Sequence, residues 1–159
     1  MTKQEASYIA GFLDGDGCIM LQLVYRHDYV LGYQIRASIV FYQKQQHFRF
    51  MDWLKEKFTA GYIRERSDGI SEYTIVGIDP VTRVLKLLLP YLRLKKPQAE
   101  ITLSVLGEMP GSGRKMQPEL LLKLAKEVDK FAFLNYSKKR TNTSIKVEKF
   151  LKSRHLLSP

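Results

Sequence analysis

The chain has 159 residues, enough for a substantial hydrophobic core, and we expect a single domain over residues 1–159. Its 26 Lys and Arg against 16 Asp and Glu give a formal net charge of +10, which predicts a polyanionic partner. Nucleic acid is the first expectation, although a ribosomal or other RNA-binding protein would be equally basic. No apolar run approaches the ~20 residues of a membrane span, so no membrane partner is expected. The polar N-terminus is unlike a signal peptide, and the single Cys18 excludes an internal disulfide.

Residues 9–17, IAGFLDGDG, predict a helix that ends on an acid. Gly11 and Gly15 lie four apart on one face, where a second helix can approach closely. Asp16 falls at the helix C-terminus, and Gly17 is expected to form a left-handed cap. A carboxylate there faces the negative end of the helix dipole, which is unfavourable unless a divalent cation binds it together with nearby free carbonyls. The segment therefore predicts both a packing surface and half of a metal site.

Alternating apolar residues predict a β-hairpin over residues 18–26 and 33–42, joined by a loop at 27–32. Its apolar face carries Ile19, Leu21, Leu23 and Tyr25, then Tyr33, Ile35, Ala37, Ile39 and Phe41. Helical spacing follows at 45–58, and a second hairpin surrounds the turn at 67–69. Further helices are predicted from Asp79 as N-cap with Pro80 to about residue 89, over 97–109 and 118–133, and from about Thr143.

This order, helix, hairpin, helix, hairpin, helices, predicts an α+β fold with one four-stranded antiparallel sheet whose apolar face is covered by helices. The opposite face would be open, polar and basic. Arg pairs well with guanine and Gln with adenine in the major groove, so this face is a candidate for reading DNA. A solvated sheet face is the plainer alternative. The candidates are Gln22, Val24, Arg26, Gln34, Arg36, Ser38, Val40, Arg64, Arg66, Glu72 and Thr74, with Asp28 in the connecting loop.

A basic loop precedes the last helix. Its cations and hydroxyls suit contacts with DNA phosphates, which fix register without reading bases, and they suit a solvated loop equally well. The candidates are Ser137, Lys138, Lys139, Arg140 and Thr143.

Residues 10–17, AGFLDGDG, resemble the signature of the LAGLIDADG homing endonucleases. The similarity also covers YQKQQ at 42–46, GYIRER at 61–66, PYLRLKKPQA at 90–99 and SKKRTNTS at 137–144. It is strongest to the intron-encoded enzymes of algal chloroplasts. The motif occurs once, and single-motif members of this size act as homodimers.

The resemblance implies the family's fold, with helices on one face of the sheet and double-stranded DNA on the other. It makes Asp16 the metal ligand beside the Gly15 carbonyl, with Mg²⁺ as cofactor and Mn²⁺ as a substitute. Two copies of Asp16 would meet on a two-fold axis, and we expect the dimer interface at Ala10, Gly11, Asp14 and Gly15. Asp14 lies within the helix and is the weaker candidate for a ligand.

The resemblance also places Gln43 and Lys95 at positions that organise active-site water and face the phosphate. Lys96 is the obvious alternative to Lys95 in RLKKPQ. Family members often carry Arg four residues after Gln43, whereas this chain has His47, which could make a weaker phosphate contact or be a plain surface residue.

The implied activity is metal-dependent cleavage of both strands at a long, pseudo-palindromic site, which initiates intron homing. An RNA-binding intron maturase and a DNA-binding regulator without cleavage are the alternatives on the same fold. The implied location is a chloroplast or mitochondrion, or otherwise the cell interior.

Overall fold

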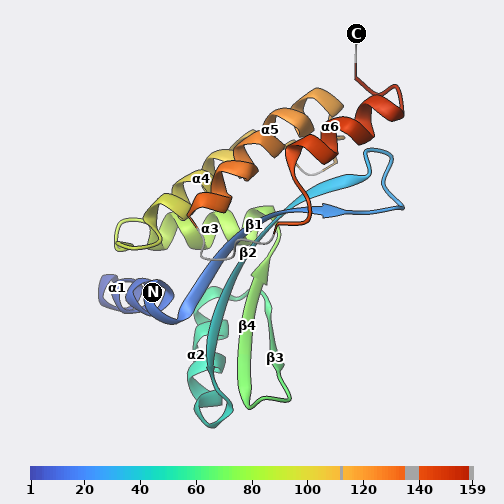
Figure 1. Cartoon of the computed structure of the whole chain (residues 1–159). Helices are drawn as coiled ribbons and strands as arrows, with labels where there is room; N and C mark the ends of the chain where they lie inside the picture. The colour runs from blue at the N-terminus through green and yellow to red at the C-terminus, as the bar shows by residue number, and fades with distance from the viewer. Residues whose placement is uncertain (112, 135–139, 158–159) are drawn as a thin grey trace. The chain divides into compact units, whose positions relative to one another are not determined.

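The computed structural model describes residues 1–111, 113–134 and 140–157. Its elements follow the predicted order (Figure 1). They are α1 (Lys3–Asp16), β1 (Gly17–Tyr25), β2 (Tyr33–Lys44), α2 (Phe48–Phe58), β3 (Tyr62–Glu65), β4 (Ile70–Val76), α3 (Ile78–Leu88), α4 (Lys96–Glu108), α5 (Pro118–Lys130) and α6 (Ser144–Ser153). Short 3₁₀ helices, η1 (Gln45–His47) and η2 (Phe131–Phe133), precede α2 and follow α5.

The four strands form one sheet in the order β1-β2-β4-β3. Strands β2 and β4 pair antiparallel from Ser38↔Val76 to Lys44↔Ile70, and β3 pairs with β4 from Tyr62↔Thr74 to Glu65↔Ser71. The two hairpins therefore join through β2 and β4, which leaves β1 and β3 at the edges. The α+β prediction is confirmed.

The chain forms two compact units. The first comprises Met1–Met20 and Ala37–Leu103, and its core lies where α1, α2 and α3 supply apolar side chains to the inner strands. Phe41 is fully buried there, with ring centroids 6.2 Å from Phe58 and 6.0 Å from Tyr73. Burial raises the pKa of Tyr73 to about 12, and its hydroxyl donates to the Ala60 carbonyl at 2.6 Å.

The second unit comprises Leu21–Arg36 and Ser104–Pro159. Its core combines strand residues such as Leu21 and Ile35 with the inner faces of α5 and α6, where Leu124 and Leu151 are fully buried. The alternation predicted for the first hairpin is confirmed, since all its expected inward residues are buried except Tyr25, which is 49% exposed.

Two predictions about helix ends are wrong. Gly17 is extended, with φ −117° and ψ 176°, so α1 does not close with a left-handed cap. Glycine is needed there for another reason, because a Cβ would lie 2.5 Å from Leu13 Cδ1 and 2.9 Å from the Leu13 carbonyl oxygen. Helix α3 begins at Ile78 with Gly77 as its N-cap, so Asp79 lies in the first turn instead of capping it.

The start of α1 carries a signal that the sequence analysis missed. Thr2 and Glu5 form a capping box: the Thr2 hydroxyl accepts from Glu5 N at 3.1 Å, and the Glu5 carboxylate accepts from Thr2 N at 2.7 Å. The spacing T-x-x-E is the usual sequence pattern of this motif.

Among the described helices, none is long and apolar enough to cross a membrane.

Candidate active site and nucleic-acid interface

Asp16 ends α1 with its side chain exposed. Within the described part of the chain, its carboxylate makes no hydrogen bond and no ion pair. The preceding Gly15 is also exposed, and the last carbonyls of a helix have no partners inside the helix. A free carboxylate and free carbonyls at one helix end are suitable oxygen ligands for a hard divalent cation.

Asp14, two residues earlier, has the opposite surroundings. Its carboxylate accepts hydrogen bonds from the backbone amides of Arg93 at 2.7 Å, Leu94 at 3.2 Å and Lys95 at 2.9 Å. These bonds occupy both carboxylate oxygens. The Asp14 carboxylate is therefore used within the chain, and its place at a dimer interface stays a prediction.

Lys95 is half-buried at the start of α4, and its ammonium donates to the carbonyl of Asp14. The lysine therefore lies against the C-terminal end of α1, where a cation interacts favourably with the helix dipole. Lys96 is exposed and makes no bond with the described residues. Of the two lysines, Lys95 therefore lies beside the end of the motif helix, and this is the lysine that the family resemblance favours.

Cys18 follows directly on this helix end, in β1. Burial raises the pKa of its thiol, while the positive charge of Lys95 acts in the opposite direction. A thiol with a raised pKa is a poor nucleophile, which favours a structural role for this residue.

Gln43 and His47 lie at and beyond the end of β2. The Gln43 side-chain oxygen accepts from the backbone amide of Lys44 at 2.9 Å. His47 is exposed, and its Nε2 lies 3.1 Å from the side-chain nitrogen of Gln46. In the free chain neither is hydrogen-bonded to Asp16 or Lys95, so the structure does not join them into a network with these two residues.

The described part of the chain offers few side-chain ligands for a metal ion. Among the described residues, no group of three or more His, Cys, Asp or Glu side chains could hold an ion. Asp16 and the carbonyl of Gly15 fit an ion whose remaining oxygen ligands come from outside the chain. A second copy of Asp16, water and phosphate oxygens are ligands of the right chemistry.

The polar face of the sheet has an uneven surface. Gln22 and Arg36 are exposed, and Val24, Gln34 and Thr74 are half-buried. Ser38 and Val40 are each only 3% exposed, and their contact with DNA bases stays a prediction.

Arg64, Arg66 and Glu72 form an ion-pair network on this face. Arg64 donates to Glu72 Oε2 through Nε at 3.0 Å, and Arg66 donates to Glu72 Oε1 at 3.1 Å. Arg66 also pairs with Asp68 at 2.5 Å. Burial favours the protonated form of Glu72, but the two arginines outweigh it and hold the pKa of this carboxyl below its usual value. The network fixes both guanidinium groups before any ligand arrives.

Arg26 is fixed in a similar way at the loop between β1 and β2. Its guanidinium pairs with both carboxylate oxygens of Asp28, at 3.0 and 2.9 Å, and lies 5.0 Å from the ring centroid of Tyr29. Arg36 differs from these arginines, since it makes no ion pair with the described residues. Its charge is therefore fully available to a polyanion.

The basic loop before α6 is described only in part, and Ser137, Lys138 and Lys139 lie outside the described residues. Arg140 makes hydrogen bonds within the chain, and its contact with DNA phosphates stays a prediction. Its guanidinium donates to the backbone carbonyls of Val128 at 2.6 Å and Leu21 at 3.0 Å, and Asn142 donates to Leu23 at 2.9 Å. The bonds to Leu21 and Leu23 satisfy carbonyls of the edge strand β1, and the bond to Val128 reaches a carbonyl of α5. Thr143 is the N-cap residue of α6.

The glycine face of α1 is open. An added Cβ at Gly11 or Gly15 would meet nothing within 4 Å, so a second helix can approach there. Ala10 is fully buried within the chain, and its place in a dimer interface stays a prediction.

An aromatic cluster beside this face was not predicted. Tyr8 is 59% exposed, and its ring centroid lies 6.1 Å from that of Phe50 on α2. Phe50 in turn contacts Phe12 at 4.8 Å and Trp53 at 5.6 Å. Helical spacing alone puts Tyr8 and Phe12 on the same face of α1 as Gly11 and Gly15, so these two rings could have been predicted. The rings from α2 could not, because their position depends on the tertiary fold.

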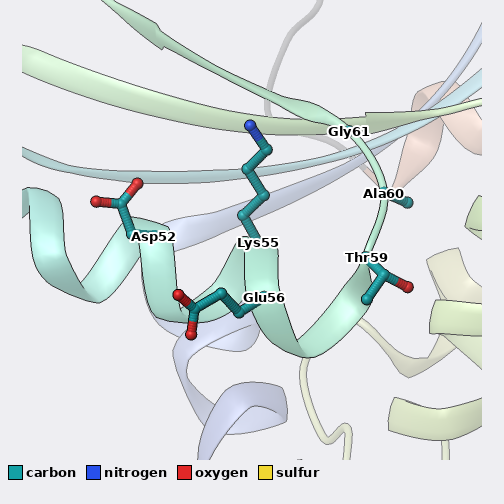
Figure 2. Close-up of a pocket in the computed structure, with 6 residues that line it drawn as sticks. All are labelled: Asp52, Lys55, Glu56, Thr59, Ala60 and Gly61. Carbon is teal, nitrogen blue, oxygen red and sulfur yellow. The ribbon is translucent and has the colours of Figure 1, made fainter.

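A surface hollow lies along α2 and the turn to β3 (Figure 2). It is lined by Asp52, Lys55, Glu56, Thr59, Ala60 and Gly61. Its two acids and one lysine give no concentrated charge, and none of the predicted site residues belongs to it.

A family model described as LAGLIDADG endonuclease matches residues 9–105, and the chain belongs to this family. The chain is 39% identical over 147 residues to DNA endonuclease I-CvuI of Chlorella vulgaris, which covers 92% of this chain and 89% of that protein. It is 35% identical over 151 residues to DNA endonuclease I-CreI of Chlamydomonas reinhardtii, and the match covers 95% of this chain and 91% of that protein. The predicted family is confirmed.

The fold is that of a solved member. A crystal structure of I-CvuI in complex with its target in the presence of calcium matches with a TM-score of 0.90 and 34% identity, over 98% of this chain and 97% of that one. A second structure of I-CvuI, with the I-CreI target and magnesium, matches with a TM-score of 0.91 and covers 98% of both chains. These complexes combine the same fold with DNA and divalent ions.

Proposed function

We propose that this chain is a metal-dependent endonuclease that cleaves both strands of DNA at one long site and so initiates intron homing. One observation carries the proposal: Asp16, at the end of the motif helix, presents a carboxylate that has no partner among the residues the structure describes. A protein that only binds DNA has no need of an unpaired acid facing a polyanion. The relatives I-CvuI and I-CreI, both DNA endonucleases, support the same conclusion.

Asp16 and the Gly15 carbonyl would hold the ion, with Mg²⁺ as the expected metal and Mn²⁺ as a substitute. Bound there, a divalent ion supplies an activated water, neutralises the scissile phosphate and stabilises the leaving 3′ oxygen. Lys95 then contributes a cation for the phosphate, because its ammonium has three donors and the Asp14 carbonyl takes one. Gln43 orients water at the site, and His47 makes a weaker contact with the phosphate.

The working unit is a homodimer in which each chain, residues 1–159, acts as one subunit. The open face at Gly11 and Gly15 lets the two motif helices cross closely, so that one Asp16 serves each DNA strand. The rings of Tyr8 and Phe50 add apolar surface beside this crossing. An exposed aromatic cluster is costly in water, and burial against a second copy removes that cost.

Each subunit reads half of a pseudo-palindromic site through the polar face of its sheet. Arg36, Gln22 and Gln34 are free to contact base edges, and the paired Arg26, Arg64 and Arg66 present guanidinium groups already fixed in place. Thr74 and Val24, both half-buried, contribute smaller surfaces. The loop at 137–139 and Thr143 are proposed to contact the DNA backbone. The location that fits an intron-homing enzyme of this kind is a chloroplast or mitochondrion.

Cleavage of a randomised-site DNA library with magnesium tests the proposal. We expect the wild-type chain to enrich one pseudo-palindromic site among the cut molecules and to leave the library intact in EDTA. Selective binding of one duplex without any cleavage would instead indicate a DNA-binding regulator, and preference for structured RNA would indicate a maturase. Either result contradicts the proposed activity.

A further inference from the structure

Asp14 and the start of α4 are connected by an unusual set of contacts. The Asp14 carboxylate accepts hydrogen bonds from three consecutive backbone amides, those of Arg93, Leu94 and Lys95. The Lys95 carbonyl accepts from Ala99 N at 3.0 Å, so Lys95 holds the N-cap position of α4. An acid from α1 therefore binds the backbone just before another helix.

Lysine is a poor residue for that position. The N-cap normally supplies a side-chain oxygen for unpaired amides, and a cation there faces the positive end of the helix dipole. Asp14 does not bind the helix amides that an N-cap side chain would bind, because its hydrogen bonds come from residues 93–95. It does place a negative charge from α1 beside the start of α4, which compensates the cation of Lys95. A lysine is tolerated at residue 95 for this reason, although the stability of α4 alone would favour Ser, Asp or Asn.

The Lys95 side chain completes the connection in the opposite direction. Its ammonium donates to the carbonyl of Asp14, in the last turn of α1 and two residues before Asp16. The side chain of Asp14 thus holds the backbone of Lys95, and the backbone of Asp14 holds the side chain of Lys95. Both ends of the lysine are fixed with respect to the helix that ends in Asp16.

We propose that Asp14 is a positioning residue, which sets the Lys95 ammonium at the end of α1 so that it meets the phosphate that Asp16 and its ion act upon. This inference rests on the proposed function. It assigns the first acid of the motif helix a role in cleavage that is separate from metal binding and that is exerted through Lys95.

A double-mutant cycle tests the proposal by single-turnover cleavage of the site selected from the randomised library, with saturating magnesium. Asp14→Asn replaces one of two acceptor oxygens by an NH₂ group that faces amide donors. We expect Lys95→Met to slow cleavage by about 10²-fold, and Asp14→Asn by about 10-fold or more. In the Lys95→Met background, Asp14→Asn should add less than about 3-fold, because the group it positions is already gone.

Hydrogen exchange gives a second measurement that does not depend on cleavage. Arg93 and Leu94 are exposed, so the protection of their amides depends on the Asp14 carboxylate. Asp14→Asn should accelerate exchange at residues 93–95, whereas Lys95→Met should leave it unchanged. Asp79→Asn is the matched control, since Asp79 is an exposed acid in the first turn of α3 without a side-chain partner among the described residues. It should change neither exchange nor cleavage.

Thermal unfolding and DNA binding in calcium separate positioning from loss of fold. Asp14→Asn should bind the selected duplex within about 3-fold of the wild type. If it does not fold, Asp14→Glu takes its place, because it keeps the charge and shifts the oxygens by one methylene. Equal losses from the Asp14 variant in both backgrounds, or unchanged exchange at 93–95, would overturn the inference. A wild-type chain that cuts nothing in the library would overturn the proposed function itself.

Discussion

Asp14 and Asp16 are two residues apart in one helix, yet one carboxylate is fully used and the other is free. The sequence distinguishes them only by position, and the hydrogen bonds from residues 93–95 explain the difference. The same is true of the arginines: Arg36 has no partner among the described residues, while Arg64 and Arg66 share Glu72. At the scale of single residues, function depends on which charged groups the fold leaves unpaired.

Glu72 makes acid stability testable. Because its pKa is lowered in the folded state, its stabilising contribution is complete above the unfolded value of about 4.5 and is lost as the pH falls through the folded value. Glu72→Gln should lower stability at neutral pH by about 1–3 kcal/mol. We expect urea unfolding to show that the difference in free energy of unfolding between variant and wild type shrinks from about pH 6 to about pH 3. A gap that widens on acidification would mean that Glu72 is not held ionised by the two arginines.

Arg36 is the best single test of base reading. Arg36→Ala should alter which bases the half-site tolerates, at a cost of about 1–3 kcal/mol for a lost bidentate contact. Selection from the randomised library with the variant measures this directly. Lys86→Ala, on the exposed side of α3, removes the same charge away from the sheet and should leave the selected site unchanged. An unchanged base preference in Arg36→Ala would place base reading elsewhere.

At the scale of elements, the pattern of hydrophobic residues predicted the order of the α-helices and β-strands among the described residues, because alternation and helical spacing depend on local sequence. Their ends were less predictable. Gly17 allows a close approach to Leu13, and the acid that binds the backbone just before α4 is Asp14 of α1, far away in sequence. The burial of Ser38 and Val40 and the inward role of Arg140 likewise depend on neighbours that no local pattern reveals.

Two glycines allow a matched test of these element ends. Gly17→Ala should destabilise the chain by about 1–3 kcal/mol, because the added Cβ overlaps Leu13 at the α1–β1 junction. Gly107→Ala should stabilise it by about 0.5–1 kcal/mol, since residue 107 is helical in α4 and a Cβ there meets nothing within 4 Å. Chemical denaturation of both variants checks the pair. If Gly17→Ala leaves the free energy of unfolding unchanged, the α1–β1 junction can relax around the added Cβ and the proposed overlap is wrong.

At the scale of the whole molecule, the open face of α1 predicts a dimer. Gly11→Leu should drive the helices apart and raise the dimer dissociation constant by at least about 10-fold, a shift of about 1.4 kcal/mol. Sedimentation velocity over a concentration series measures it. Gly107→Leu, on an exposed position of α4, is the control and should sediment like the wild type. A wild-type chain that remains monomeric both free and on DNA contradicts the half-site account.

The most direct test of the central claim compares wild type and Asp16→Asn on the duplex selected from the library. The substitution keeps the size of the side chain and removes the charge that a divalent ion requires. In calcium both proteins should bind the duplex with dissociation constants within about 10-fold of each other, and in magnesium only the wild type should cut both strands. Cleavage by Asp16→Asn at a rate near that of the wild type would contradict the assignment of this carboxylate as the metal ligand.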